Sequence, residues 1–304
     1  GEIERSGSDK LFALLQGALP QHLLSRGMHA LARSRQPAVR NLVLRTVLRS
    51  YPQIDMHEAL QPDPFTYESF NAFFTRELRP GARPIAADAH ALVSPVDGTV
   101  SQLGRTTAGA LLQAKGMQYT CAALLADAPA VTRYHGGSFA CLYLAPYNYH
   151  RIHMPCDAVL RATRYVPGQL FSVNAATART VPDLFARNER VVCDFDTADG
   201  PLCMVLVGAI FVGSIETVFA GDGEHRRGRV EVDAEGAAAY PVEEVHRRES
   251  EPHPHDVAGE REGEFVLGVT RGCTNERLVV GVAADNLMHA DDIGSLDLVP
   301  LSGE

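Results

Sequence analysis

Two stretches of the 304-residue chain, RVVCDFDT at 190–197 and CMVLVGAIFVGSIETVFAG at 203–221, decide the fold class. Both are rich in Val, Ile and Phe, which favour β-strands, and glycines divide the second into short runs. Runs of the same kind occur at 91–104, 138–146, 227–233, 264–270 and 277–283, and the polar stretch 244–264 reads as a long surface loop. Because long helical patterns are few, the sequence predicts a mainly antiparallel β-sandwich or barrel-like core.

The N-terminal segment follows a different pattern. Between residues 11 and 50, apolar residues recur at helical spacing, and Pro20 and Pro37 divide the segment into short helices. This segment contains several Arg residues and no Asp or Glu. Apolar helix faces bordered only by Arg suit a helix in a membrane interface, but an ordinary helical cap on the core would look the same. With a further helix expected at 70–78, the fold class is predicted to be α+β.

Composition argues against several classes of protein. The net charge of −9 argues against nucleic acid as the main partner, because phosphate binding needs an excess of Lys and Arg. No apolar run approaches the roughly 20 residues that would cross a bilayer. The six cysteines form no CxxC pair, which indicates a reducing compartment rather than a disulfide framework. These features predict a cytoplasmic globular protein.

The sharpest local feature is YHRIHMP at 149–155, which holds two histidines three residues apart. In a regular strand His150 and His153 would point to opposite faces, so they can meet only where the backbone bends. Imidazole titrates near neutrality, which makes the pair a candidate for general acid–base catalysis. Two other interpretations stay open at this point: a metal site, for which no third ligand stands out, and two structural histidines.

Asp97 lies in SPVDGTV at 94–100. An Asp-Gly pair between strands commonly forms a hairpin turn, which is the structural interpretation. The functional interpretation is a carboxylate that orients a histidine and stabilises its cation. Spacing along the chain does not choose between the two.

Seven ordered segments, from about Tyr67 to Gly221, resemble the phosphatidylserine decarboxylases. They are FNAFFTRELRPGARPI (70–85), SPVDGTVSQLG (94–104), LQAKG (112–116), YLAPYNYHRIHMPCDA (143–158), YVPGQLFSVN (165–174), LFARNERVV (184–192) and LVGAIFVGSIETVFAG (206–221). The N-terminal helices look like that family's membrane-docking region. By this resemblance the chain divides into a membrane-associating region at 1–66, a catalytic core at 67–268 and a C-terminal segment at 269–304.

The resemblance implies a pyruvoyl-dependent carboxy-lyase made as a proenzyme, with no PLP and no metal. In that family a serine attacks its own preceding carbonyl, the chain splits, and the new terminus becomes a pyruvoyl group. That group forms a Schiff base with phosphatidylserine and accepts the electrons left by CO2. Carried onto this sequence, Asp97 and His153 activate the serine, and His150 positions the carboxylate or delivers the proton. The substrate-binding residues implied in the same way are Gly168, Phe171 and Ser172.

The decisive position departs from the family pattern. Residues 263–270, GEFVLGVT, fit the family's GxFxLGST segment, with Val269 where the family has serine and Gly268–Val269 as the bond to be cut. Valine carries no oxygen or sulfur on its β-carbon, so it can neither attack the carbonyl nor yield a pyruvoyl group. Cys273, in a Gly-Cys-Thr sequence, is a candidate substitute nucleophile, and the alternative is an ordinary buried cysteine.

Three hypotheses follow. The first is an enzyme that converts phosphatidylserine to phosphatidylethanolamine as a peripheral protein on the cytoplasmic face of the cell membrane. The second is an uncleaved, catalytically silent relative that keeps lipid or partner binding. The third is a metal-dependent hydrolase built on the histidine pair, for which the sequence offers no further support. The resemblance further implies a homodimer, and the expected partners are the phospholipid membrane and phosphatidylserine, with no nucleic acid.

Overall fold

The computed structural model describes residues 7–86, 91–106, 109–114, 117–127, 129–212, 215, 217, 229–231, 239–240 and 278–284. Three helices lead the chain, α1 (Gly7–Ala18), α2 (Gln21–Ala32) and α3 (Pro37–Ser50), and the short α4 (Phe70–Phe74) follows. Pro20 and Pro37 stand at the starts of α2 and α3, as the sequence predicts, because proline lacks the N–H that continues a helix. None of the helices in these ranges is long and apolar enough to cross a bilayer.

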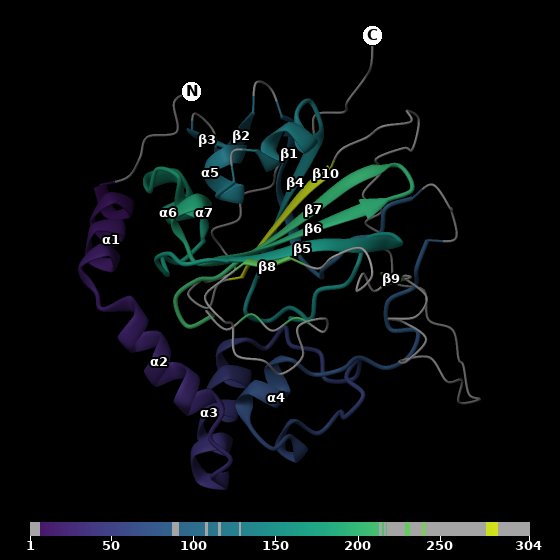
Figure 1. The fold of residues 1–304 in the computed structure, drawn as a ribbon. Helices are drawn as coiled ribbons and strands as arrows, with labels where there is room; N and C mark the ends of the chain where they lie inside the picture. The colour runs from purple at the N-terminus through teal and green to yellow at the C-terminus, as the bar shows by residue number, and fades with distance from the viewer. Residues whose placement is uncertain are drawn as a thin grey trace.

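One large sheet forms the centre of the molecule (Figure 1). Its strand order is β1-β4-β10-β7-β6-β5-β8, with β9 also paired to β5. The strands are β1 (Thr99–Arg105), β4 (Ser138–Leu144), β5 (Ala158–Val166), β6 (Arg190–Thr197), β7 (Gly200–Val207), β8 (Arg229–Glu231), β9 (Ala239–Tyr240) and β10 (Leu278–Ala284). Strand β10 runs parallel to both of its neighbours, β4 and β7, whereas the other pairs are antiparallel.

Both faces of this sheet are buried. On β7, Cys203, Val205 and Val207 belong to one hydrophobic cluster, and Leu202, Met204 and Leu206 belong to a second. Because successive side chains of a strand point to opposite faces, the two clusters lie on opposite sides of the sheet. This two-sided burial explains why β7 reads as a continuous apolar run rather than as alternation.

Shorter elements cover the face of the first cluster. They are the two-stranded sheet of β2 (Ala110–Ala114) and β3 (Met117–Thr120), the helices α5 (Cys121–Leu125), α6 (Ala175–Thr180) and α7 (Leu184–Arg187), and the 3₁₀ turn η2 (Ala130–Tyr134). Another 3₁₀ turn, η1 (Pro64–Thr66), lies before α4. A third, smaller core of Leu44, Tyr67 and Phe73 joins α3 to α4.

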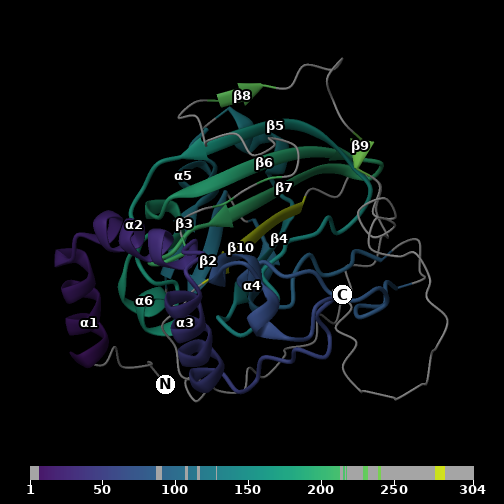
Figure 2. The ribbon, with the colours of Figure 1, turned by 90° about the horizontal axis from the view of Figure 1, so that it is seen from below.

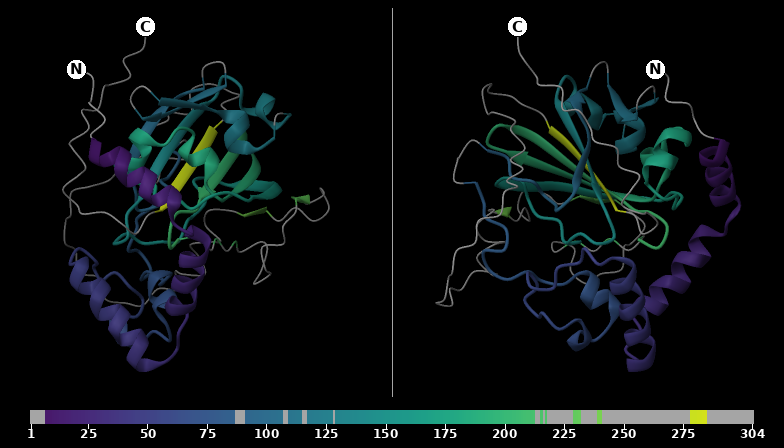
Figure 3. Two further views of the ribbon diagram at one scale, coloured as in Figure 1. Left: turned by 90° about the vertical axis from the view of Figure 1, so that its left-hand side faces the viewer. Right: turned by 180° about the vertical axis from the view of Figure 1, so that it is seen from behind.

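The N-terminal helices lie along the outside of the sheet domain (Figures 2 and 3). Helix α1 packs beside α6, and two buried glutamines, one on α1 and one at the start of α2, attach these helices to the core. Gln16 bonds both the backbone N–H and the hydroxyl of Ser172, and Gln21 accepts from the N–H of Leu170. The outward side carries eight exposed leucines: Leu11, Leu14, Leu15, Leu19, Leu23, Leu24, Leu31 and Leu42.

The predicted α+β class is confirmed, whereas the predicted barrel-like core is wrong. The described strands form no closed barrel, and a second large sheet that would make a sandwich is not found among them. Helices on the face of the first cluster take the place of a facing sheet. Most predicted runs in the described ranges coincide with strands, but β2, β3, β5 and β9 were missed, and β7 ends at Val207 instead of continuing through 208–212. The run at 264–270 and the loop at 244–264 lie outside the described residues.

Candidate active site

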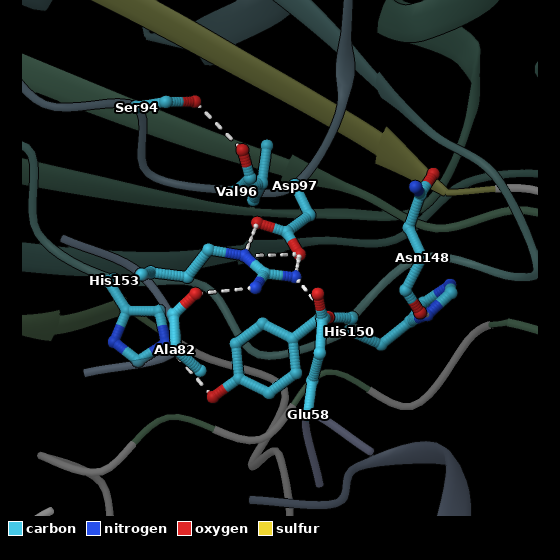
Figure 4. Close-up of polar contacts among 10 residues, drawn as sticks. Glu58, Ala82, Ser94, Val96, Asp97, Asn148, His150 and His153 are labelled. Carbon is cyan, nitrogen blue, oxygen red and sulfur yellow. Dashed lines mark hydrogen bonds and ion pairs between the residues drawn. The ribbon is translucent and has the colours of Figure 1, made fainter. Parts of the chain in front are cut away.

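A group of polar side chains gathers where three separate segments meet. The segments are the turn after α4, the bend before β1 that carries Asp97, and the chain after β4 that carries His150 and His153 (Figure 4). Backbone hydrogen bonds hold the last two together. The N–H of His153 donates to the carbonyl of Pro95 at 2.9 Å, and that of Val93 donates to Pro155 at 3.0 Å. Asp97 and His153 therefore lie on neighbouring segments, although 56 positions part them in the sequence.

The Asp97–Gly98 pair does not form a hairpin turn. Residues 95–97 bend before β1, and β1 pairs with β4, which is distant in sequence. Gly98 is required there by close packing, since a β-carbon at this position would lie 2.8 Å from the carbonyl oxygen of Tyr143. Gly98 therefore brings the Asp97 segment directly against β4.

The carboxylate of Asp97 is held by Arg83. The Nε of Arg83 donates to both Asp97 oxygens at 2.8 and 2.9 Å, and its Nη2 donates to Oδ2 at 2.5 Å. The same Nη2 donates to Glu58 at 2.7 Å, and Nη1 donates to the carbonyl of Ala82. The hydrogen bonds to Asp97 are the main reason that the pKa of Arg83 is raised. Asp97 is thus held in place by Arg83, which partners both of its oxygens.

Each of the two histidines has its own surroundings. The Nε2 of His153 lies 3.0 Å from the hydroxyl of Tyr149, and the two rings stack with centroids 5.6 Å apart. The ring of His150 packs against that of Phe74, with the ring centroids 3.8 Å apart and the planes tilted by 34°. Its Nδ1 lies 2.8 Å from the carbonyl oxygen of Asn148. In the view of Figure 4 the histidines lie to either side of Asp97. The two rings contact different partners, so the structure does not show them acting as one pair.

Burial lowers the pKa of His150 to about 4, with a contribution from the nearby Arg76 cation, while the Asn148 carbonyl opposes the shift. At neutral pH this imidazole is uncharged. A neutral ring beside a carbonyl acceptor carries its proton on Nδ1, which donates to Asn148. The Nε2 of His150 is enclosed and finds no hydrogen-bond partner in the part of the chain that the structure describes. Its lone pair is therefore available to accept a proton or a hydrogen bond.

The predicted substrate-binding residues lie on the other side of the sheet. Phe171 belongs to the first hydrophobic cluster, whereas Val96 and Ile152, next to Asp97 and His153, pack in the second. A β-carbon on Gly168 would come within 2.5 Å of the backbone at 187–189, so close packing explains this glycine. Ser172 is fully buried and bonded to Gln16 and Asn174. A role for these residues in substrate binding stays a prediction.

Several residues at the site were not singled out from the sequence. Arg83 lies in the family segment 70–85 and Glu58 precedes that segment, but neither was assigned a role from the sequence. Only the fold reveals that Arg83 joins Glu58 to Asp97. The residues Gly268, Val269 and Cys273 lie outside the described ranges. Within those ranges, no group of three or more His, Cys, Asp or Glu side chains could hold a metal ion.

Comparisons with known proteins identify the family of this chain. The family model for phosphatidylserine decarboxylase matches residues 70–270, and a second model, described as PSD, matches residues 11–52. A phosphatidylserine decarboxylase proenzyme of Bordetella avium is 53% identical over 214 residues, which are 70% of this chain and 72% of that protein. Proenzymes of the same name from Shewanella baltica and Pseudoalteromonas translucida are 55% and 52% identical, over 70% of this chain and 73% and 74% of theirs. The chain therefore belongs to the phosphatidylserine decarboxylase family of carboxy-lyases.

Proposed function

We propose that this chain is an uncleaved proenzyme scaffold that binds phosphatidylserine, with the acid–base groups for self-cleavage and decarboxylation already in place. The observation that carries the proposal is the hydrogen-bonded pairing of residues 93–95 with 153–155, which brings the Asp97 and His153 segments side by side. In this proposal His153 accepts the proton of a hydroxyl at position 269, and Asp97 supports the resulting cation. His150 acts later, on the lipid headgroup, through its enclosed Nε2.

The residue at position 269 does not fit the family's pyruvoyl group. When present, that group supplies an electron-accepting carbonyl next to the substrate amine. It has to be made from a residue with a heteroatom on the β-carbon, and Val269 has only methyl groups there. We therefore propose that this exact chain stays whole and does not decarboxylate, while the remainder of the machinery is intact.

Restoring the hydroxyl tests this proposal. The wild-type chain, Val269→Ser and Val269→Ala would be purified, and their intact masses measured under denaturing conditions. Val269→Ala is the matched control because it shortens the side chain in the same way without adding a hydroxyl. We expect the wild type and Val269→Ala to run as single species near 32.9 kDa. Val269→Ser should split between residues 268 and 269.

The same spectra separate the alternatives. An unsplit Val269→Ser chain would contradict the proposal that position 269 alone blocks processing. A fragment of the wild type that begins at residue 273 would instead assign the chemistry to Cys273, and Cys273→Ala should then abolish it. In a cleaving Val269→Ser background, Asp97→Asn and His153→Gln should each prevent the split, because they remove the carboxylate and the proton acceptor.

We further propose that the N-terminal helices dock on an anionic membrane surface. Seven of the eight exposed leucines lie on α1 and α2 or between them, and the described part of residues 11–50 contains no acid. Arg26, Arg33, Arg45 and Arg49 are exposed on α2, at its C-terminal end and on α3. A leucine-rich face bordered by guanidinium groups suits the boundary between acyl chains and lipid phosphates.

Vesicle binding tests the docking. Replacing Arg26, Arg33, Arg45 and Arg49 with Gln should weaken binding to vesicles containing phosphatidylglycerol by roughly 10- to 1,000-fold, since each surface cation contributes about 1 kcal/mol. Arg40 is left unchanged because it holds the carbonyl of Tyr67. A control that replaces Arg161 and Arg187, which lie on the sheet domain, should bind as the wild type does. Equal binding by both variants would remove the docking proposal.

A further inference from the structure

Arg76, two residues beyond α4, is a buried cation at the edge of the site. Its side chain is only 5% exposed, and its guanidinium lies over the ring of Phe73, 5.4 Å from the centroid. The Nε is enclosed and has no hydrogen-bond partner among the described residues. Within the described ranges, no ion pair joins Arg76 to a carboxylate. Burial lowers the pKa of this guanidinium, which shows that the charge is held at a cost.

Two acids lie near Arg76, but their hydrogen bonds go elsewhere. Glu58 and Asp97 are close enough to attract the Arg76 charge. Both oxygens of Asp97 and the Oε2 of Glu58, however, accept from Arg83 at 2.5 to 2.9 Å. A buried guanidinium with an unused donor is unfavourable unless an anion completes it. Arg83 is therefore paired with carboxylates, whereas Arg76 keeps an unused hydrogen-bond donor.

His150 lies near Arg76. The two groups are close enough for Arg76 to lower the pKa of His150, and the packing of His150 on Phe74 joins its segment to the end of α4. Arg151 strengthens the junction by donating to the carbonyl of Thr75 at 2.8 Å. The free Nε2 of His150 is an acceptor, so it cannot donate a hydrogen bond to a carboxylate. Of these two neighbours, only Arg76 can bind an anion.

We propose that Arg76 binds the serine carboxylate of the phospholipid headgroup, and that His150 serves as the proton-handling group beside it. The proposal rests on the proposed function, with phosphatidylserine as the ligand. A planar guanidinium matches a carboxylate in geometry and charge. Phosphatidylethanolamine, the product, has the same phosphodiester and amine but no carboxylate. Arg76 therefore distinguishes substrate from product, and its contact disappears when CO2 leaves.

The test is non-covalent binding to the intact wild-type chain. Dihexanoyl-phosphatidylserine and dihexanoyl-phosphatidylethanolamine would be titrated below their micelle concentrations, with affinity measured by calorimetry. Arg76→Met removes the charge, and Arg76→Lys keeps the charge but loses the planar fork. Arg79→Met is the matched control, because Arg79 is three residues away and exposed. Circular dichroism and thermal unfolding would verify the fold of each variant.

We expect the wild type and Arg79→Met to prefer the serine lipid. Arg76→Met should lose about 10- to 100-fold in affinity for it, with little change for the ethanolamine lipid. The affinity of Arg76→Lys for the serine lipid should lie between those of the wild type and Arg76→Met. If Arg76→Met does not fold, Arg76→Lys provides the test of the assignment. An equal loss for both lipids would move the contact to the phosphodiester and overturn the assignment to the carboxylate, and an unchanged preference would overturn it as well. A wild type that does not prefer the serine lipid would instead count against phosphatidylserine as the ligand.

Discussion

Two buried polar regions of this molecule differ in how completely their hydrogen bonds are satisfied. The first, where residues 168–174 meet α1 and α7, is dominated by amides and hydroxyls: Gln16, Gln21, Ser172, Asn174, Thr177 and Asn188. No buried side-chain atom of these six residues lacks a hydrogen-bond partner. The second, around α4 and residues 148–153, leaves the Nε of Arg76 and the Nε2 of His150 without partners.

The difference distinguishes buried polar groups that hold the fold together from buried polar groups that are open to a ligand. A fully bonded network fixes one arrangement of the chain and has no capacity left for a ligand. Unused donors and acceptors inside a protein are costly, so a pair of them on adjoining segments indicates a place where something else binds. The family segments contribute residues to both regions. The resemblance predicted substrate binding by Gly168, Phe171 and Ser172, which lie in the region whose buried polar side chains are all hydrogen-bonded.

The largest effect on this contrast is expected from Asn188→Ala. Asn188 is fully buried, accepts from the N–H of Phe171, and donates to the carbonyls of Phe171 and Gly208. Its loss leaves three backbone groups unbonded, and we expect the free energy of unfolding to fall by roughly 3–5 kcal/mol. Urea denaturation measures this. Gln169→Ala, at an exposed amide in the same segment, should cost well under about 1 kcal/mol. Similar losses for both variants would mean that the network is not the structural anchor.

A second effect concerns pH and the unsatisfied region. The pKa of His150 is about 4 in the folded chain, below its ordinary value of 6.5. Between pH 6.5 and 4 the unfolded chain therefore binds a proton that the folded chain does not. Stability should fall as the pH is lowered through this window, and His150 should account for roughly 2–3 kcal/mol of the loss.

His150→Gln removes that titration. The loss of unfolding free energy between pH 7.5 and 4.5 should be smaller in His150→Gln than in the wild type, and His22→Gln, at an exposed position, should follow the wild type. Direct NMR titration of the imidazole gives a second measurement. If His150 titrated near 6.5 in the folded chain, the ring would not be desolvated, and the contrast between the two regions would weaken.

The smallest effect is expected where the N-terminal helices join the satisfied network. Gln16→Leu removes the hydrogen bond that Gln16 donates to the Ser172 hydroxyl and the one that it accepts from the backbone N–H of Ser172. We expect a loss of about 1–2 kcal/mol in unfolding free energy, together with faster amide hydrogen exchange in α1 and at Ser172. Gln102→Leu, on the edge strand β1, is a control that should leave exchange at Ser172 unchanged. Unaltered protection in Gln16→Leu would show that apolar packing alone holds α1.

Much of the architecture could be predicted from local pattern. The prolines at 20 and 37 set the starts of α2 and α3 because proline is excluded from helix interiors, and runs such as 138–146 and 190–197 became strands because β-branched and aromatic residues suit a buried sheet. Strand β5 was missed because its Arg161, Arg164 and Tyr165 interrupt the apolar pattern. The barrel-like core was predicted because long helical patterns are few. The apolar runs could not correct this, since burial on both faces leaves no alternation from which the facing layer could be inferred.

The sequence by itself determined the family, the α+β class and the absence of a β-carbon heteroatom at Val269, and it singled out Asp97, His150 and His153 as candidate site residues, because these depend on residue type and order. Tertiary structure alone decided which groups meet. It assigned both Glu58 and Asp97 to Arg83, put Phe171 and Val96 on opposite faces of the sheet, and left Arg76 beside His150 without a bonded anion. The physical reason is that hydrogen bonding and desolvation depend on distances between residues far apart in the chain, and local sequence does not encode those distances.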